Sequence, residues 1–113
     1  MQSYDIIITP DAEIDLNEIK DYIAYELFSP DTALTYTNEI KALITKLEYL
    51  APSIAPVPDE PFHSMGIRKI IANKFFVYFW INENANTVFI LNVIYQRRDQ
   101  LKALKHLNKS EKQ

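Results

Sequence analysis

The stretch TVFILNVIYQRRDQ, residues 87–100, decides the fold, because a long apolar segment leads directly into a pair of arginines. Residues 87–95 are rich in β-branched and aromatic side chains, which is typical of a strand. Apolar residues fall on both alternating faces, which are Phe89, Leu91, Val93 and Tyr95 on one and Val88, Ile90 and Ile94 on the other. We therefore expect a central strand, covered on both sides of the sheet. Asn92 is the polar exception, and it needs a hydrogen-bond partner if it is buried.

Two apolar segments upstream predict the neighbouring strands. IRKIIA follows Gly66, and FFVYFWIN occupies residues 75–82. Asn73 and Lys74 form a tight turn between them, and the polar residues 82–86 form a second turn before the central strand. The three segments together predict an antiparallel meander.

The first half of the chain predicts two helices. Thr9 as N-cap and Pro10 at the first helical position mark one start, and Ser29 with Pro30 marks the next. Each helix carries one apolar stripe at spacings of three and four, namely Ala12, Leu16, Ile19, Ile23 and Leu27, then Ala33, Tyr36, Ile40, Leu43, Leu47 and Leu50. Helices joined by so short a link are expected to pack as an antiparallel hairpin.

The remaining segments complete an α+β domain. Residues 3–8 predict a short strand, and residues 51–64, with four of the six prolines, predict a stiff crossover. Residues 99–107 predict a short C-terminal helix with Asp99 as N-cap, and the tail from about residue 108 is expected to be disordered. The predicted order is β-α-α-β-β-β, an antiparallel sheet packed against a helical hairpin in a single domain, residues 1–113.

The composition indicates a cytoplasmic protein with one core. A chain of 113 residues is too short for two cores. No apolar run approaches the ~20 residues that span a bilayer, and the N-terminus lacks the layout of a signal peptide. Cysteine is absent and glycine occurs once, which argues against a disulfide framework, a cysteine–metal site and a phosphate-binding loop. We expect no membrane partner, no metal and no cofactor.

Charge is divided unevenly along the chain. Residues 1–60 hold three lysines and twelve carboxylates, a net charge of −9, whereas residues 61–113 hold nine lysines and arginines and three carboxylates, a net charge of +6. The division predicts an acidic and a basic face with different partners. The alternative is that the exposed helices are simply acidic, and charge alone does not choose between the two.

Three segments carry a resemblance to a known family. They are Ile67-Arg68-Lys69-Ile70, the aromatic strand at 75–80, and the Tyr-x-Arg-Arg-Asp ending at 95–99. With the strand and the helical hairpin before them, they resemble the RelE/ParE superfamily of bacterial type II toxins over roughly residues 3–104. The resemblance implies a small toxin, a cognate antitoxin that silences it in a hetero-oligomer, and growth arrest when the antitoxin is degraded.

The superfamily has two kinds of target. RelE-like members cut mRNA in the ribosomal A site, whereas ParE-like members inhibit DNA gyrase. The Ala-x-x-x-Leu-x-x-Ile helix beginning at Ala12 and its long hairpin look ParE-like. RelE-like enzymes commonly carry a basic residue where this chain has Phe75, and that departure weakens the RNA-cleavage interpretation.

Tyr95, Arg97 and Arg98 are the candidate catalytic residues if the chain cleaves RNA. A guanidinium binds phosphate bidentately, and the resemblance places a His or Tyr at the position of Tyr95, where a phenol would act more readily as an acid than as a base. No base accompanies them, because His63 lies in the crossover and His106 near the end of the chain.

Arg68, Arg97 and Arg98 are the candidate target-binding residues, and each has a structural explanation as well. Arg97 and Arg98 point in opposite directions if the strand persists, so one could pair with a carboxylate of the hairpin. Arg68 could equally form an internal ion pair, and Tyr95 could be a core tyrosine. We expect at least one of the three arginines to be structural.

Three hypotheses for function follow. The leading one is a ParE-like toxin that inhibits DNA gyrase and is neutralised by a cognate antitoxin. The alternatives are a ribosome-dependent mRNA endoribonuclease of the RelE type, and a non-toxic, degenerate toxin fold kept as a binding module. The antitoxin is expected to lay an extended or helical segment along the groove beside the hairpin, with an acidic stretch over the basic half.

Overall fold

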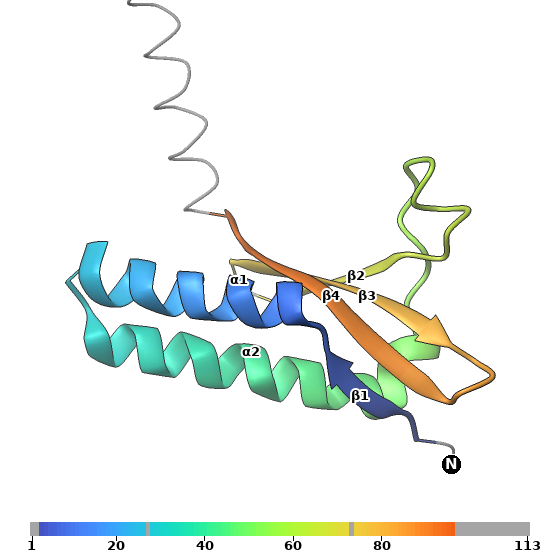
Figure 1. Ribbon diagram of the computed structural model, residues 1–113, viewed down its shortest axis with the longest axis horizontal. Coiled ribbons are helices and arrows are strands. Elements are labelled where there is room, and N and C mark those ends of the chain that lie inside the picture. The colour runs from blue at the N-terminus through green and yellow to red at the C-terminus, as the bar shows by residue number, and fades with distance from the viewer. Residues whose placement is uncertain (1–2, 27, 73, 97–113) are drawn as a thin grey trace, which may run out of the picture.

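The computed structural model describes residues 3–26, 28–72 and 74–96, and its elements follow the predicted α+β order. These elements are β1 (Asp5–Ile8), α1 (Pro10–Asp21), the π-helical turn η1 (Tyr22–Glu26), α2 (Pro30–Leu50), the 3₁₀ turn η2 (Ala51–Ser53), β2 (Arg68–Ala72), β3 (Phe75–Asn82) and β4 (Thr87–Tyr95). Figure 1 shows α1 and α2 running antiparallel, which confirms the helical hairpin. The predicted C-terminal helix at 99–107 and the tail beyond it lie outside the described residues.

Both predicted helix starts are confirmed. Thr9 caps α1, since its Oγ1 accepts a hydrogen bond from the N–H of Ala12 at 3.3 Å. The same hydroxyl donates to the carbonyl of Ile90 at 2.7 Å, so the cap also fastens the start of α1 to β4. The second helix begins at Pro30, although the hydroxyl of Ser29 donates to Thr32 Oγ1 instead of capping the backbone. No helix in the described part of the chain is long and apolar enough to cross a lipid bilayer.

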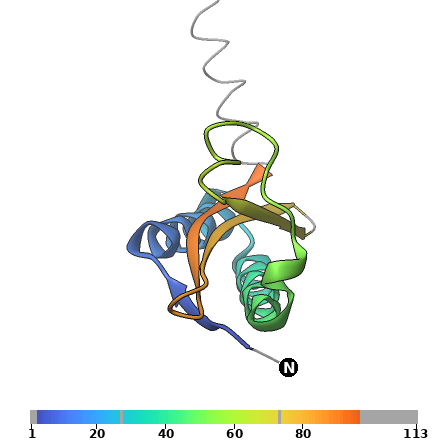
Figure 2. The same ribbon diagram turned by 90° about the vertical axis from the view of Figure 1, so that its right-hand side faces the viewer.

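The sheet has the order β1-β4-β3-β2, so β4 is an interior strand, as expected. The meander β2-β3-β4 is antiparallel, but β1 pairs in parallel with β4, and the whole sheet is therefore mixed. The helical hairpin between β1 and the meander supplies the long connection that a parallel pair requires. Figure 2 shows α2 on one side of this curved sheet and most of the crossover on the other.

A β-bulge changes which side chains of β4 are buried. The register with β3 shifts between Tyr78 and Phe79, which leaves Leu91 as an extra residue in β4. The buried positions of β4 therefore switch from even to odd numbers, and the residues facing the core are Val88, Ile90, Val93 and Tyr95. The strict alternation expected from the sequence was wrong, because one inserted residue reverses every later side chain.

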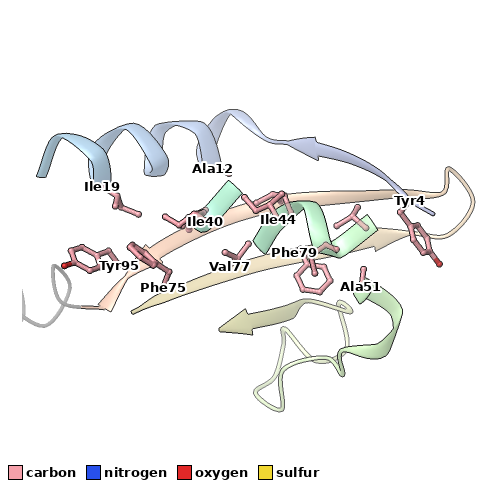
Figure 3. Close-up of a cluster of buried hydrophobic side chains, with 14 of the residues drawn as sticks. Tyr4, Ala12, Ile19, Ile40, Ile44, Ala51, Phe75, Val77, Phe79 and Tyr95 are labelled. Atoms are coloured by element: carbon pink, nitrogen blue, oxygen red, sulfur yellow. The ribbon is translucent and has the colours of Figure 1, made fainter. Parts of the chain in front are cut away.

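The core lies between the helical hairpin and the inner face of the sheet (Figure 3). Ile19 of α1 and Ile40 of α2 are almost fully buried there with Val77 and Phe79 of β3. Burying such a side chain contributes about 1.5–3 kcal/mol relative to leaving it in water. In the described part of the chain no helix covers the opposite, outer face of the sheet, where the crossover lies instead. Phe89, Leu91 and Ile94 of β4 are half-buried on that face, so the expected cover on both sides of β4 is only partial.

Tyr4 joins β1 to the turn between β3 and β4. Its hydroxyl donates to Glu83 Oε2 at 3.0 Å, and its N–H donates to the carbonyl of Glu48 in α2. Burial raises the pKa of Tyr4 above its ordinary value, the hydrogen bond to Glu83 and the charge of that carboxylate raise it further, and the charge of Arg68 lowers it. The folded protein therefore favours the protonated phenol.

Tyr4→Phe is expected to make the protein less sensitive to alkali. Since the folded-state pKa is raised, Tyr4 contributes its full stabilisation below the unfolded pKa of about 10, and this is lost as the pH rises through the folded pKa. Urea unfolding at neutral pH and above pH ~10 measures the effect. The variant should lose less stability between the two conditions than the wild type, and equal losses would contradict this role of Tyr4.

Candidate functional site

An open groove of about 620 Å³ lies on the outer face of the sheet. Lys69, Tyr78 and Asn92 are neighbours across β2, β3 and β4 and form its floor. Asp15 of α1 and Phe62 of the crossover contribute to its walls. The bulge in β4 places Leu91 and Asn92 together at this groove, because it interrupts the alternation of faces between them.

Asp15 completes the hydrogen bonding of β4 at the edge of the groove. Strand β1 pairs with β4 only as far as Ile90, so the rest of that edge needs other partners. Asp15 Oδ2 accepts a hydrogen bond from the backbone N–H of Val93 at 2.9 Å and from Asn92 Nδ2 at 3.2 Å. A helical carboxylate thus takes the place that a longer β1 would have filled.

The charge of the groove does not fit a phosphate backbone. Lys69 is the one lysine or arginine among the described residues that line it, and two carboxylates, Asp15 and Asp59, accompany it. The ammonium of Lys69 lies 4.8 Å from the ring centre of Phe76 and 6.0 Å from that of Tyr78, which are cation–π distances. The ammonium group of Lys69 therefore lies close to the rings of Phe76 and Tyr78.

Exposed apolar side chains surround the groove. Ile71 of β2 is 57% exposed and Trp80 of β3 is 38% exposed, and the indole of Trp80 stacks on Phe89 at 5.8 Å between ring centres. Phe62 and Met65 of the crossover are also exposed. Exposed apolar residues gathered around a hollow are typical of a protein-binding surface.

Tyr95 lies in the core and not in the groove. It is 1% exposed, and its ring stacks on Phe75 at 5.0 Å. The rings of Tyr22 and Tyr36 approach it edge to face at 6.1 and 6.3 Å, so that side chains from η1, α2 and β3 enclose it. The position where RelE-like enzymes carry a basic residue, Phe75, belongs to this same cluster.

Arg68 is directed toward the crossover. Its Nη1 donates to the carbonyls of Pro52 at 3.2 Å and Ile54 at 2.5 Å, and its Nε is buried without a hydrogen-bond partner in the described structure. Arg97 and Arg98 lie outside the described residues, so the structure does not test the two other candidate arginines. His63 Nδ1 lies 3.0 Å from the carbonyl of Val57, and no three metal-ligating side chains gather anywhere in residues 3–26, 28–72 and 74–96.

A family model of the ParE toxin of the type II toxin–antitoxin system parDE matches residues 6–100. The chain belongs to the ParE toxin family. No curated protein matches the sequence.

Solved structures with the ParE and RelE fold resemble this chain. A chain of the chromosomal ParDE toxin–antitoxin system from P. aeruginosa matches with a TM-score of 0.68 and 24% identity, over 82% of this chain and 96% of that one. A chain of the RelBE2 toxin–antitoxin complex from Mycobacterium tuberculosis matches with a TM-score of 0.61 and 17% identity, over 82% of this chain and 98% of that one. At these identities the likeness concerns the fold.

Sequence reasoning missed Asp15 and Trp80 as residues of the groove and of the outer face around it. Asp15 lies three residues after Ala12 and four before Ile19, and this acidic residue beside the apolar stripe of α1 was the available signal. Trp80 belongs to the aromatic strand at 75–80, and an aromatic strand alone does not tell which face is covered. Asn92 is exposed, so the expectation of a partner for a buried asparagine does not apply to it, although its Nδ2 donates to Asp15.

Asp15→Ala is expected to destabilise the ParE fold by about 1.5–3 kcal/mol, because the N–H of Val93 loses a charged acceptor. Urea unfolding would measure the change. The matched control is Asn17→Ala, an exposed position of the same helix, which should change stability by less than about 0.5 kcal/mol. Equal effects of the two substitutions would mean that the bond to β4 contributes nothing.

Proposed function

We propose that this ParE-family toxin arrests growth in the cytoplasm by binding DNA gyrase, and that a cognate antitoxin neutralises it. The observation that carries this proposal is the burial of Tyr95, the candidate acid of an RNA-cleaving site. A general acid must come within hydrogen-bond reach of the atom that it protonates. A phenol enclosed by Tyr22, Tyr36 and Phe75 does not meet that requirement in this conformation.

The other described candidates also favour a protein target over RNA. Arg68 is engaged by two backbone carbonyls, and the groove holds one lysine against two carboxylates. RNA binding depends on several cations directed at phosphates. The apolar residues around the groove and on the hairpin instead have the chemistry of protein interfaces.

Two observations still favour the endoribonuclease hypothesis. The fold also resembles a chain of the RelBE2 complex, and Arg97 and Arg98 follow β4 outside the described residues. An RNA site would therefore have to include these two arginines and move Tyr95 out of the core. Both requirements can be tested together with the gyrase hypothesis.

Tyr95→Phe is expected to retain both growth arrest and inhibition of purified DNA gyrase, since the ring and its packing are kept. The measurements are growth after induction without antitoxin and a plasmid supercoiling assay with purified toxin. Loss of growth arrest in Tyr95→Phe, with codon-phased mRNA cuts made only by the wild type, would support the endoribonuclease instead. An absence of growth arrest by the wild type would support the degenerate binding module.

The antitoxin surface is proposed to be the outer face of the sheet. The groove offers a hollow, and Ile71 and Trp80 offer exposed apolar area to an antitoxin segment. Strands β1 and β2 form the two edges of the sheet, so an extended segment can add hydrogen bonds there. The two solved relatives come from toxin–antitoxin systems, which is consistent with such a partner.

Trp80, the single tryptophan of the chain, provides a direct test of this surface. Binding of the antitoxin across the outer face should move the Trp80 fluorescence to shorter wavelength and protect it from acrylamide, because the indole leaves water. A tryptophan-free antitoxin is titrated into the toxin, and the Trp80→Phe variant, which has no tryptophan fluorescence, serves as the control. Tight binding that leaves the emission and its quenching unchanged would place the antitoxin elsewhere.

A further inference from the structure

The turn between α1 and α2 has a backbone conformation that its sequence does not favour. The π-helical turn η1 ends at Glu26, and the N–H of Ser29 donates to the carbonyl of Ile23 at 3.2 Å, six residues back. Phe28 stands just before Ser29 with φ +51°, in the left-handed region. A helix that ends on a left-handed residue usually has glycine there.

Phe28 is the exception among the described residues with positive φ. The other two are Gly66 at φ +77° and Asn86 at φ +53°, and glycine and asparagine are the residue types that tolerate this region. A bulky aromatic side chain at positive φ is strained. Burial does not compensate for the strain, since the side chain of Phe28 is 88% exposed.

Tyr25 adds a second exposed aromatic ring to the same turn, at 73% exposure. Around it the hairpin is acidic, because Asp21, Glu26 and Asp31 are exposed and Lys20 is the one cation between residues 20 and 32. We define the hairpin tip as Tyr25 and Phe28 with these three carboxylates. Its charge would repel a nucleic-acid backbone and would attract a protein surface that carries lysine or arginine.

The base of the hairpin tip is rigidly held. Ile23 is fully buried, and the ring of Tyr22 packs edge to face against Tyr95 at 6.1 Å. The exposed rings of Tyr25 and Phe28 are therefore attached to a well-packed turn, which reduces the conformational entropy that the turn loses on binding. Figure 1 shows the hairpin turn at one end of the molecule and the crossover, which borders the outer groove, toward the other.

We propose that the hairpin tip docks the protein target of this toxin, at an apolar pocket flanked by basic side chains. Phe28 is the anchor that enters the pocket, Tyr25 packs beside it, and the three carboxylates meet the basic rim. The proposal rests on a protein target, as inferred above, and assigns target binding to a surface separate from the outer face of the sheet. It also explains why a strained, exposed phenylalanine is present at the turn.

Phe28→Gly separates binding from stability, because it removes the ring and relieves the backbone strain together. The variant should melt at the same temperature as the wild type or higher. It should need about tenfold or more of the wild-type concentration to inhibit purified gyrase in the supercoiling assay, as expected for loss of an anchor residue. Growth arrest on induction should weaken in parallel, and affinity for the antitoxin should stay unchanged.

Three further variants serve as controls. Phe28→Ala removes the ring but keeps the strain, so it should weaken inhibition without any gain in melting temperature. Phe28→Tyr keeps an aromatic ring and should inhibit more strongly than Phe28→Ala. Tyr49→Ala removes an exposed aromatic residue of α2 far along the chain from the turn, and it should leave inhibition unchanged.

Each contrary outcome has a distinct meaning. If the wild type and Phe28→Gly inhibit gyrase equally, the hairpin tip is not the docking surface, while the gyrase proposal stands. If the wild type leaves gyrase active but arrests growth, the gyrase proposal fails, and the growth of Phe28→Gly cells then tests the hairpin tip. Weaker growth arrest by Phe28→Gly would support target binding by the tip, and unchanged growth arrest would overturn it. A large drop in melting temperature or in antitoxin affinity for Phe28→Gly would overturn the inference, and so would a wild type that does not arrest growth.

Discussion

Strand β4 must satisfy its backbone hydrogen bonds on both sides, although β1 accompanies only its first half. The remaining side is completed by α1, whose cap residue Thr9 donates to the carbonyl of Ile90 and whose Asp15 accepts from Val93. These bonds place α1 along β4, and the short turn to α2 then places the second helix under the sheet. The arrangement of both layers therefore depends on completing this one interior strand.

The bulge at Leu91 decides which chemistry the two faces of the sheet present. Without it, Val93 and Tyr95 would share the outer face with Phe89, since side chains alternate along a strand. With it, Tyr95 packs in an aromatic cluster against the hairpin, and Asn92 opens onto the groove with Lys69 and Tyr78. The same inserted residue thus buries a candidate catalytic phenol and shapes a surface suited to a protein partner.

The two exposed apolar regions differ in chemistry, in keeping with the proposal that each binds a different partner. The outer face combines apolar residues with two sheet edges and a groove that holds Lys69 with Asp15 and Asp59, whereas the hairpin tip combines exposed aromatic rings with carboxylates. If each region binds a different partner, the affinity of one contact can change without altering the other.

Local patterns in the sequence were enough to predict the strands, the helical hairpin, both helix starts and the meander, because helical periodicity, capping and turn chemistry act over a few residues. Tertiary structure alone decided the parallel pairing of β1, the bulge and the burial of Tyr95, and it directed Nη1 of Arg68 to the carbonyls of the crossover. Asp15 and Val93 lie 78 residues apart along the chain, and no local pattern specifies such a bond. It forms only when the folded sheet leaves a backbone group that must be satisfied.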